Sequence, residues 1–200
     1  MSALNKRRRA VALVLVAAAV GGGSGCDDPF GLKATLGVAN DTLVAFAMTG
    51  TTASFPAGYN ASTGAVTRIE PAIGFDVAFD LADGNKVRLV PARLVSAIKL
   101  SFAGPVATQQ VGLQTSSSTF EAITKAPSTG YKRDSVVVVD PGQPVIIEVN
   151  SDVCQFTISN IYYAKIVVDS VNRSSRQIFF RATRDPNCGF RSFLPGVPKS

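Results

Sequence analysis

The sequence predicts an all-β domain, built most simply as an antiparallel β-sandwich. Short runs rich in Val, Ile, Phe, Thr and Ala recur along the chain, and clusters of Gly, Pro, Asn, Asp and Ser separate them. Beyond the first 25 residues, apolar side chains nowhere keep a helical period for long. A closed β-barrel is the alternative fold, because many short strands of similar spacing suit both architectures.

Strands are expected wherever a run of β-forming residues lies between two turn signals. One short helix is also expected near residues 119–125, because Ser118 and Glu121 have the spacing of a capping box, and this helix would bury Phe120 and Ile123. The expected strands cover residues 33–38, 42–49, 65–69, 75–81, 87–91, 97–102, 109–114, 135–139, 145–149, 154–158, 162–171 and 177–183.

One hairpin can be predicted in register. Its apolar and polar residues alternate on both sides of a turn at residues 83–85. Because partners in an antiparallel pair must share a face, this turn has to be a three-residue loop, and Asp80 then lies opposite Arg88. The register puts Phe and Leu side chains on the core face. It puts Asp76 and Asp80 on a solvated face, where an Asp80–Arg88 ion pair would add little stability.

A second hairpin is expected from residues 135 to 149. Its turn, residues 140–143, is Asp-Pro-Gly-Gln, with Pro and Gly in positions that favour a tight turn. Pro144 follows directly. Because proline has no N–H to donate to a sheet, Pro144 indicates an edge strand.

The first 25 residues have the three parts of an export signal. Lys6 and the three arginines after it form a positive cluster, residues 10–20 are apolar, and residues 21–25 are all Gly or Ser. An apolar run of this length is too short to cross a bilayer, which takes about 20 residues. We therefore expect residues 1–25 to be a signal peptide that is removed.

Cys26 follows this signal directly. Ser24, Gly25 and Cys26 resemble the lipobox of bacterial lipoproteins, although Gly23 stands where that family usually carries a bulky aliphatic residue. The resemblance implies that Cys26 is acylated, for example with palmitate, and becomes the N-terminus of a protein anchored to a membrane. The alternative is ordinary signal cleavage before Cys26, which would leave it as a free thiol.

The chain has three cysteines, an odd number for an exported protein. Cys154 and Cys188 both belong to the mature part, and an oxidising compartment would allow them to form a disulfide. In the chain-entropy model, a bridge that closes such a loop contributes about 3–4 kcal/mol. This pairing would leave Cys26 for acylation. The alternative is that Cys154 and Cys188 are two buried free thiols.

Removal of the signal leaves a chain of ordinary size for one domain. We expect residues 26–32 to be a lipidated N-terminus and short tether, and residues 33–200 to be a single β domain. The net charge falls from +6 to +2, because the signal holds four of the 20 basic residues and the 16 that remain face 14 acidic ones. We therefore expect no nucleic-acid partner.

The remaining positive charge is concentrated near the C-terminus. Residues 165–200 hold seven basic side chains against Asp169 and Asp185. Such a basic patch could meet an envelope protein, an anionic glycan or a lipid headgroup, and the alternative is a solvated sheet edge. The candidate residues are Arg173, Arg176, Arg181, Arg184 and Arg191.

The residues that usually carry catalysis are scarce. The chain has no His, and no Ser or Cys stands in a nucleophile motif. We expect no catalytic residue, no cofactor and no metal site. The sequence therefore predicts a non-enzymatic lipoprotein that faces the periplasm or the cell exterior and acts as a binding or scaffolding module. A β-barrel carrier or sensor of an apolar ligand is the alternative.

Overall fold

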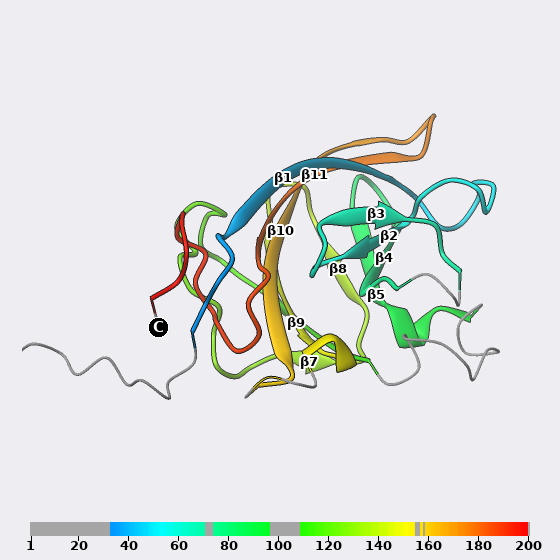
Figure 1. Cartoon of the computed structure of the whole chain (residues 1–200). Coiled ribbons are helices and arrows are strands. Elements are labelled where there is room, and N and C mark those ends of the chain that lie inside the picture. Colours follow the sequence, from blue (N-terminus) through cyan, green and yellow to red (C-terminus); the bar gives the residue numbers. More distant parts are fainter. Residues whose placement is uncertain (1–32, 71–73, 97–108, 155–156, 158, 200) are drawn as a thin grey trace, which may run out of the picture. The chain divides into compact units, whose positions relative to one another are not determined.

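Two antiparallel sheets face each other as a β-sandwich (Figure 1), so the predicted fold class is confirmed. The computed structural model describes residues 33–70, 74–96, 109–154, 157 and 159–199. Across these residues the sheets do not close into a barrel, and the helical segments are two short 3-10 helices, Ala92–Leu94 and Asp152–Cys154. No helix in this part of the chain has the length and apolar character needed to cross a membrane.

The sheets differ in size. The larger sheet has six strands in the order β1–β11–β10–β9–β6–β7, and the smaller has five in the order β3–β2–β4–β5–β8. The larger sheet comprises β1 (Ala39–Phe46), β6 (Gln110–Thr115), β7 (Lys132–Arg133), β9 (Pro144–Asn150), β10 (Ile161–Asn172) and β11 (Gln177–Asp185). The smaller sheet comprises β2 (Gly58–Asn60), β3 (Ala65–Thr67), β4 (Val77–Leu81), β5 (Val87–Pro91) and β8 (Val137–Val139).

The main core lies between the sheets, where alternate residues of the strands point inward. Phe180 of β11 contacts two aromatic side chains of the smaller sheet. The centroid of its ring lies 4.7 Å from that of Phe79 in β4 and 5.5 Å from that of Tyr59 in β2. All three side chains are fully buried, and burying a large apolar side chain contributes about 1.5–3 kcal/mol. These contacts join the two sheets.

The hairpin of β4 and β5 has the predicted register, with Asp80 opposite Arg88. The N–H of Ala82 donates to the Lys86 carbonyl at 2.9 Å, which leaves residues 83–85 as the predicted three-residue loop. The period of the side chains fixed this register, because any even-numbered loop would have mixed the two faces.

The solvated face predicted for Asp80 is wrong. Its carboxylate is buried and accepts hydrogen bonds from the N–H of Thr49 at 3.2 Å and from the Thr49 hydroxyl at 2.6 Å. Arg176, rather than Arg88, is its ionic partner, at 3.8 Å. The β1–β2 loop, residues 47–57, covers this part of β4, and strand alternation alone does not reveal such a cover.

Asp76 also departs from the predicted face. It precedes β4, and its carboxylate accepts hydrogen bonds from the N–H of Ala61 at 2.5 Å, from the Tyr162 hydroxyl at 2.8 Å and from the Gln109 amide. Phe75 packs instead in a separate cluster on the outer face of the smaller sheet. The regular alternation therefore starts only with β4, and Asp76 links this sheet to β10 of the other.

The hairpin predicted from residues 135 to 149 is wrong. Its turn forms, since the N–H of Gln143 donates to the Asp140 carbonyl at 3.1 Å. However, β8 before the turn belongs to the smaller sheet and β9 after it belongs to the larger one. Pro144 is the first residue of β9, an inner strand, which is a position where its missing N–H is tolerated.

The short helix predicted near residues 119–125 is absent. Residues 120–122 form only a turn, although Phe120 and Ile123 are buried as expected. Pro127 limits any helix here to about two turns, and helices this short are marginal unless tertiary packing stabilises them.

A buried lysine satisfies the carbonyls of this turn. The Lys165 ammonium of β10 donates to the carbonyls of Phe120 at 2.6 Å and Ile123 at 2.9 Å. It also lies 4.2 Å from the centroid of the Phe120 ring and 5.6 Å from that of Phe193. Burial lowers the pKa of Lys165. The interaction fixes the 120–123 turn on the outer face of the larger sheet.

Several strand boundaries differ from the expected ones. Instead of two strands at residues 33–38 and 42–49, a single strand, β1, begins at Ala39. The short strands β2 and β7 were not predicted. The strand expected at 97–102 lies outside the described residues, as does most of the one expected at 154–158, whose first residue ends a 3-10 helix.

Replacing Asp80 by Ala should lower the free energy of unfolding by about 2 kcal/mol, because Thr49 and Arg176 lose a buried charged partner. The matched control is Asp140→Ala, which breaks the exposed ion pair with Lys86 and should change stability by no more than about 0.5 kcal/mol. Urea denaturation measures both. Equal losses in the two variants would show that Asp80 has no special role in holding the β1–β2 loop.

Candidate functional site

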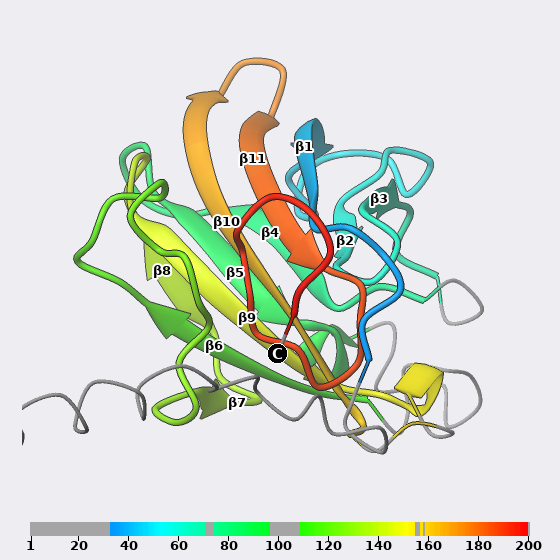
Figure 2. The same cartoon turned by 60° about the vertical axis from the view of Figure 1, so that its left-hand side comes forward.

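The two ends of the described chain meet at one end of β1. Residues 33–38 (blue) and the C-terminal segment (red) lie side by side in Figures 1 and 2. Val38 forms an isolated antiparallel bridge with Gly196, and its N–H donates to the Gly196 carbonyl at 2.9 Å. We call the surface formed by residues 33–38 and 190–199 the terminal face.

Asn187 fastens the N-terminal stretch to this face. Its side-chain oxygen accepts hydrogen bonds from the N–H groups of Thr35 at 2.9 Å and Leu36 at 3.0 Å. Its amide nitrogen donates to the Leu36 carbonyl at 2.8 Å and to the Asp185 carboxylate at 2.7 Å. Sequence reasoning missed this residue. The Asp-Pro-Asn sequence at 185–187 signals a turn, but it does not signal a partner so far away in the sequence.

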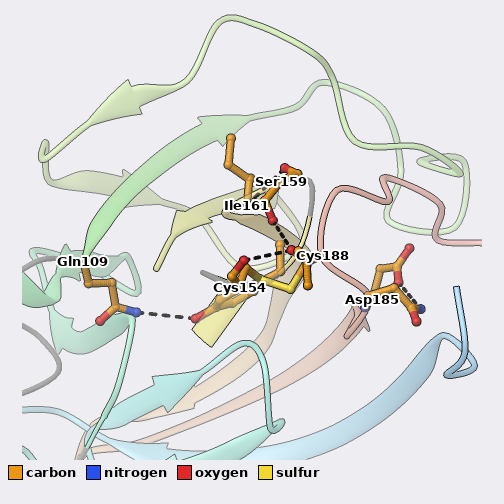
Figure 3. Close-up of a disulfide and its surroundings, with 9 residues drawn as sticks. Gln109, Cys154, Ser159, Ile161, Asp185 and Cys188 are labelled. Atoms are coloured by element: carbon orange, nitrogen blue, oxygen red, sulfur yellow. Dashed lines mark hydrogen bonds between the residues drawn. A yellow bond between two sulfur atoms is a disulfide. The ribbon is translucent and has the colours of Figure 1, made fainter. Parts of the chain in front are cut away.

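Cys154 and Cys188 form the predicted disulfide (Figure 3), with their Cα atoms 5.8 Å apart. Cys154 is buried at the end of a 3-10 helix, and Cys188 directly follows Asn187. Beside the bond, the N–H of Gly189 donates to the Ile161 carbonyl at 2.7 Å. The C-terminal segment is therefore tied covalently to the connection between β9 and β10.

The terminal face is apolar and positively charged. Three of the large apolar side chains that are exposed in the described residues belong to it: Leu36, Leu194 and Val197, exposed by 54%, 56% and 52%. The two segments that form the face also contain three basic residues and no Asp or Glu. The basic residues are Lys33, Arg191 and Lys199.

The arginines of the predicted basic patch do not gather on one surface. Arg181 lies on the outer face of the larger sheet, where it pairs with Asp169 at 3.0 Å and Glu121 at 2.8 Å. Arg184 pairs with Asp41 at 3.2 Å and also donates to a carbonyl of the β2–β3 turn. Both guanidinium groups are therefore engaged within the domain.

The other three arginines lie elsewhere. Arg173 and Arg176 are at the turn between β10 and β11, where Arg173 donates to the Ala82 carbonyl at 3.1 Å and Arg176 approaches Asp80. Arg191 belongs to the terminal face and forms no ion pair with another described residue. A binding role for these arginines stays a prediction.

An apolar pocket of about 250 Å³ opens beside the β1–β2 loop, which follows β1 at the end away from the terminal face. The ring of Phe55, which lines the pocket, stacks on Phe46, the last residue of β1, with centroids 4.5 Å apart. Sequence reasoning missed the pocket, because its wall is a loop rich in Thr and Ala. The pocket is lined by Met48, Thr51, Thr52, Ala53, Phe55, Ala57, Ile69, Val95 and Ser96.

Asp76 is a fully buried carboxyl group between the two sheets. Burial raises the pKa of Asp76 to about 7, against the hydrogen bonds from Ala61 and Tyr162, which lower it. Burial also raises the pKa of Tyr162 well above its usual value. The group can exchange a proton near neutral pH, but it has no exposed surface on which to meet a substrate. Among the described residues, no cluster of three or more His, Cys, Asp or Glu side chains is arranged to hold a metal.

Comparisons with models of protein families, with curated proteins and with solved structures found no match to this chain. Its function must therefore be inferred from the residues described above.

The buried Asp76 predicts a specific dependence of stability on pH. An Asp in the unfolded chain titrates near a pKa of about 4, so the folded protein holds an extra proton between about pH 4 and pH 7. The contribution of this group to the free energy of unfolding should be largest below about pH 4. It should then fall by up to about 4 kcal/mol as the pH rises to 7.

This slope can be isolated by denaturation of the wild type and of Asp76→Asn across that pH range. The variant should lack the slope, whereas the exposed control Asp140→Asn should keep it. If Asp76→Asn and the wild type show parallel curves, folding does not raise the pKa of Asp76.

Proposed function

We propose that this chain is a non-enzymatic lipoprotein of the cell envelope that acts as a binding or scaffolding module. In this proposal Cys26 is acylated after removal of residues 1–25 and anchors the protein to a membrane, facing the periplasm or the cell exterior. The arrangement of the cysteines carries the proposal. Cys154 and Cys188 are bonded to each other, so Cys26 is the cysteine outside this disulfide. It lies directly after the signal-like segment and seven residues before Lys33.

The position of the pocket supports a binding role. A tether of seven residues reaches at most about 25 Å, so an anchored domain would stay close to the membrane. The eight residues of β1 span about 27 Å between the terminal face, where the described chain begins, and the pocket beside Phe55. The pocket would thus remain available to a partner in the envelope.

The apolar lining of the pocket also favours a second function, the carriage or sensing of an apolar ligand. Small-molecule sites are typically concave and mostly apolar, with a few polar groups that orient the ligand. Thr51, Thr52 and Ser96 would be such groups here. The volume suits a small apolar group rather than a complete lipid molecule.

Acylation is tested first. Cells grown with labelled palmitate should incorporate the label into the wild type, and the protein should be found in the membrane fraction. The variant Cys26→Ser should lose both properties, because it lacks the proposed acceptor thiol. The control Ser24→Ala keeps a small residue before the cysteine and should retain the label. A mature wild-type protein with an unmodified Cys26 thiol, detected by intact mass, would refute the anchor.

Ligand binding is tested with a neutral apolar fluorescent probe, N-phenylnaphthylamine. The wild type should enhance its emission. Ala53→Phe places an aromatic ring at the pocket lining and should abolish most of this enhancement. Ser54→Phe adds the same group at the next residue, which does not line the pocket, and should preserve the enhancement. If the wild type does not bind the probe, or if both variants behave alike, the pocket is not an apolar ligand site.

A further inference from the structure

We infer that the terminal face is a membrane-docking surface, on which Leu36, Leu194 and Val197 enter the boundary between the headgroups and acyl chains of a phospholipid bilayer. The inference rests on the proposed lipid anchor and adds a second contact with the membrane. It concerns a surface different from the apolar pocket and from the four arginines that are engaged within the domain.

The apolar side chains are concentrated where the chain begins. Leu36 lies two residues before the Val38–Gly196 bridge, and Leu194 and Val197 flank its other side. Each has more than half of its surface exposed, although large apolar side chains are normally buried in the core. A cluster of this kind rimmed by polar residues is typical of an interaction surface.

The charge of the terminal face fits an anionic bilayer. Lys33, Arg191 and Lys199 lie on the same two segments as the apolar side chains, and these segments contain no carboxylate side chain. Lys and Arg near a membrane surface are attracted to anionic headgroups. A surface with exposed Leu and Val beside Lys and Arg has the composition of segments that bind in the membrane interface.

The face is held in a fixed shape before any contact with the membrane. Asn187 binds the backbone of Thr35 and Leu36 through three hydrogen bonds, and the Cys154–Cys188 disulfide anchors the C-terminal segment next to it. Phe193 of this segment is buried in a cluster on the outer face of the larger sheet. The exposed side chains therefore lose little backbone freedom when they meet a surface.

The short tether is the reason why we infer that a bilayer, rather than another partner, contacts the terminal face. Residue 33 belongs to the face itself, and Cys26 precedes it by only seven residues. A lipid on Cys26 would hold the terminal face within about 25 Å of the membrane at all times. The exposed Phe55, by contrast, follows the opposite end of β1, which lies about 27 Å further along the strand.

The chain contains no Trp, so a single introduced indole reports its own surroundings. The variants Leu194→Trp and Leu36→Trp are expressed from the full-length gene, purified as the cell processes them, and reconstituted in vesicles of phosphatidylcholine and phosphatidylglycerol, with or without bromine on the acyl chains. The matched control is Phe55→Trp, which puts the indole at another exposed apolar position. We expect bromine to remove most of the indole emission of Leu194→Trp or Leu36→Trp and to leave that of Phe55→Trp unchanged.

Flotation of the same vesicles separates the two proposals. Protein that fails to float with the vesicles overturns the lipid anchor, and the docking surface falls with it. Protein that floats but shows no more quenching in Leu194→Trp and Leu36→Trp than in Phe55→Trp keeps the anchor and overturns the docking surface. Thermal melting of all three variants checks that each indole is carried by a folded domain.

Discussion

The contact of Phe180 with Phe79 and Tyr59 joins the two sheets, and much of the surface follows from it. Because β11 alternates, placing Phe180 in the core puts Arg181 on the outer face of the larger sheet and turns Arg184 toward the smaller one. Arginines that are close together in the sequence therefore lie on different surfaces. A charge cluster in a strand does not produce a charge cluster in space.

The buried ionisable side chains hold connections of the domain in place. Asp80 fixes the β1–β2 loop through Thr49, Lys165 fixes the 120–123 turn, and Asp76 connects the two sheets through Tyr162. Each one supplies a hydrogen-bonding partner that the backbone of a loop or a neighbouring side chain would otherwise lack. This explains how long connections can cover both outer faces of a sandwich that contains almost no helix.

Local patterns of the sequence predicted local structure well. The features that could not be predicted depend on contacts between residues far apart in the sequence. The register of β4 and β5 followed from alternation within one hairpin, and the disulfide followed from a count of cysteines. The turn at residues 140–143 has the same local signals as a hairpin turn, so its crossing between the sheets had no signature in the sequence. The role of Asn187 also had no signature in the sequence, because its partners come from the other end of the domain.

Strand β1 therefore separates two structural features, the terminal face and the pocket. At its start, Asn187 and the disulfide hold the terminal face, and at its end Asp80 holds the loop that forms the pocket. The two sets of contacts share no residue and lie about 27 Å apart, so their energetic effects should be additive. If one end of the domain is anchored to a membrane as we propose, this separation would leave the pocket at the other end free to bind a ligand.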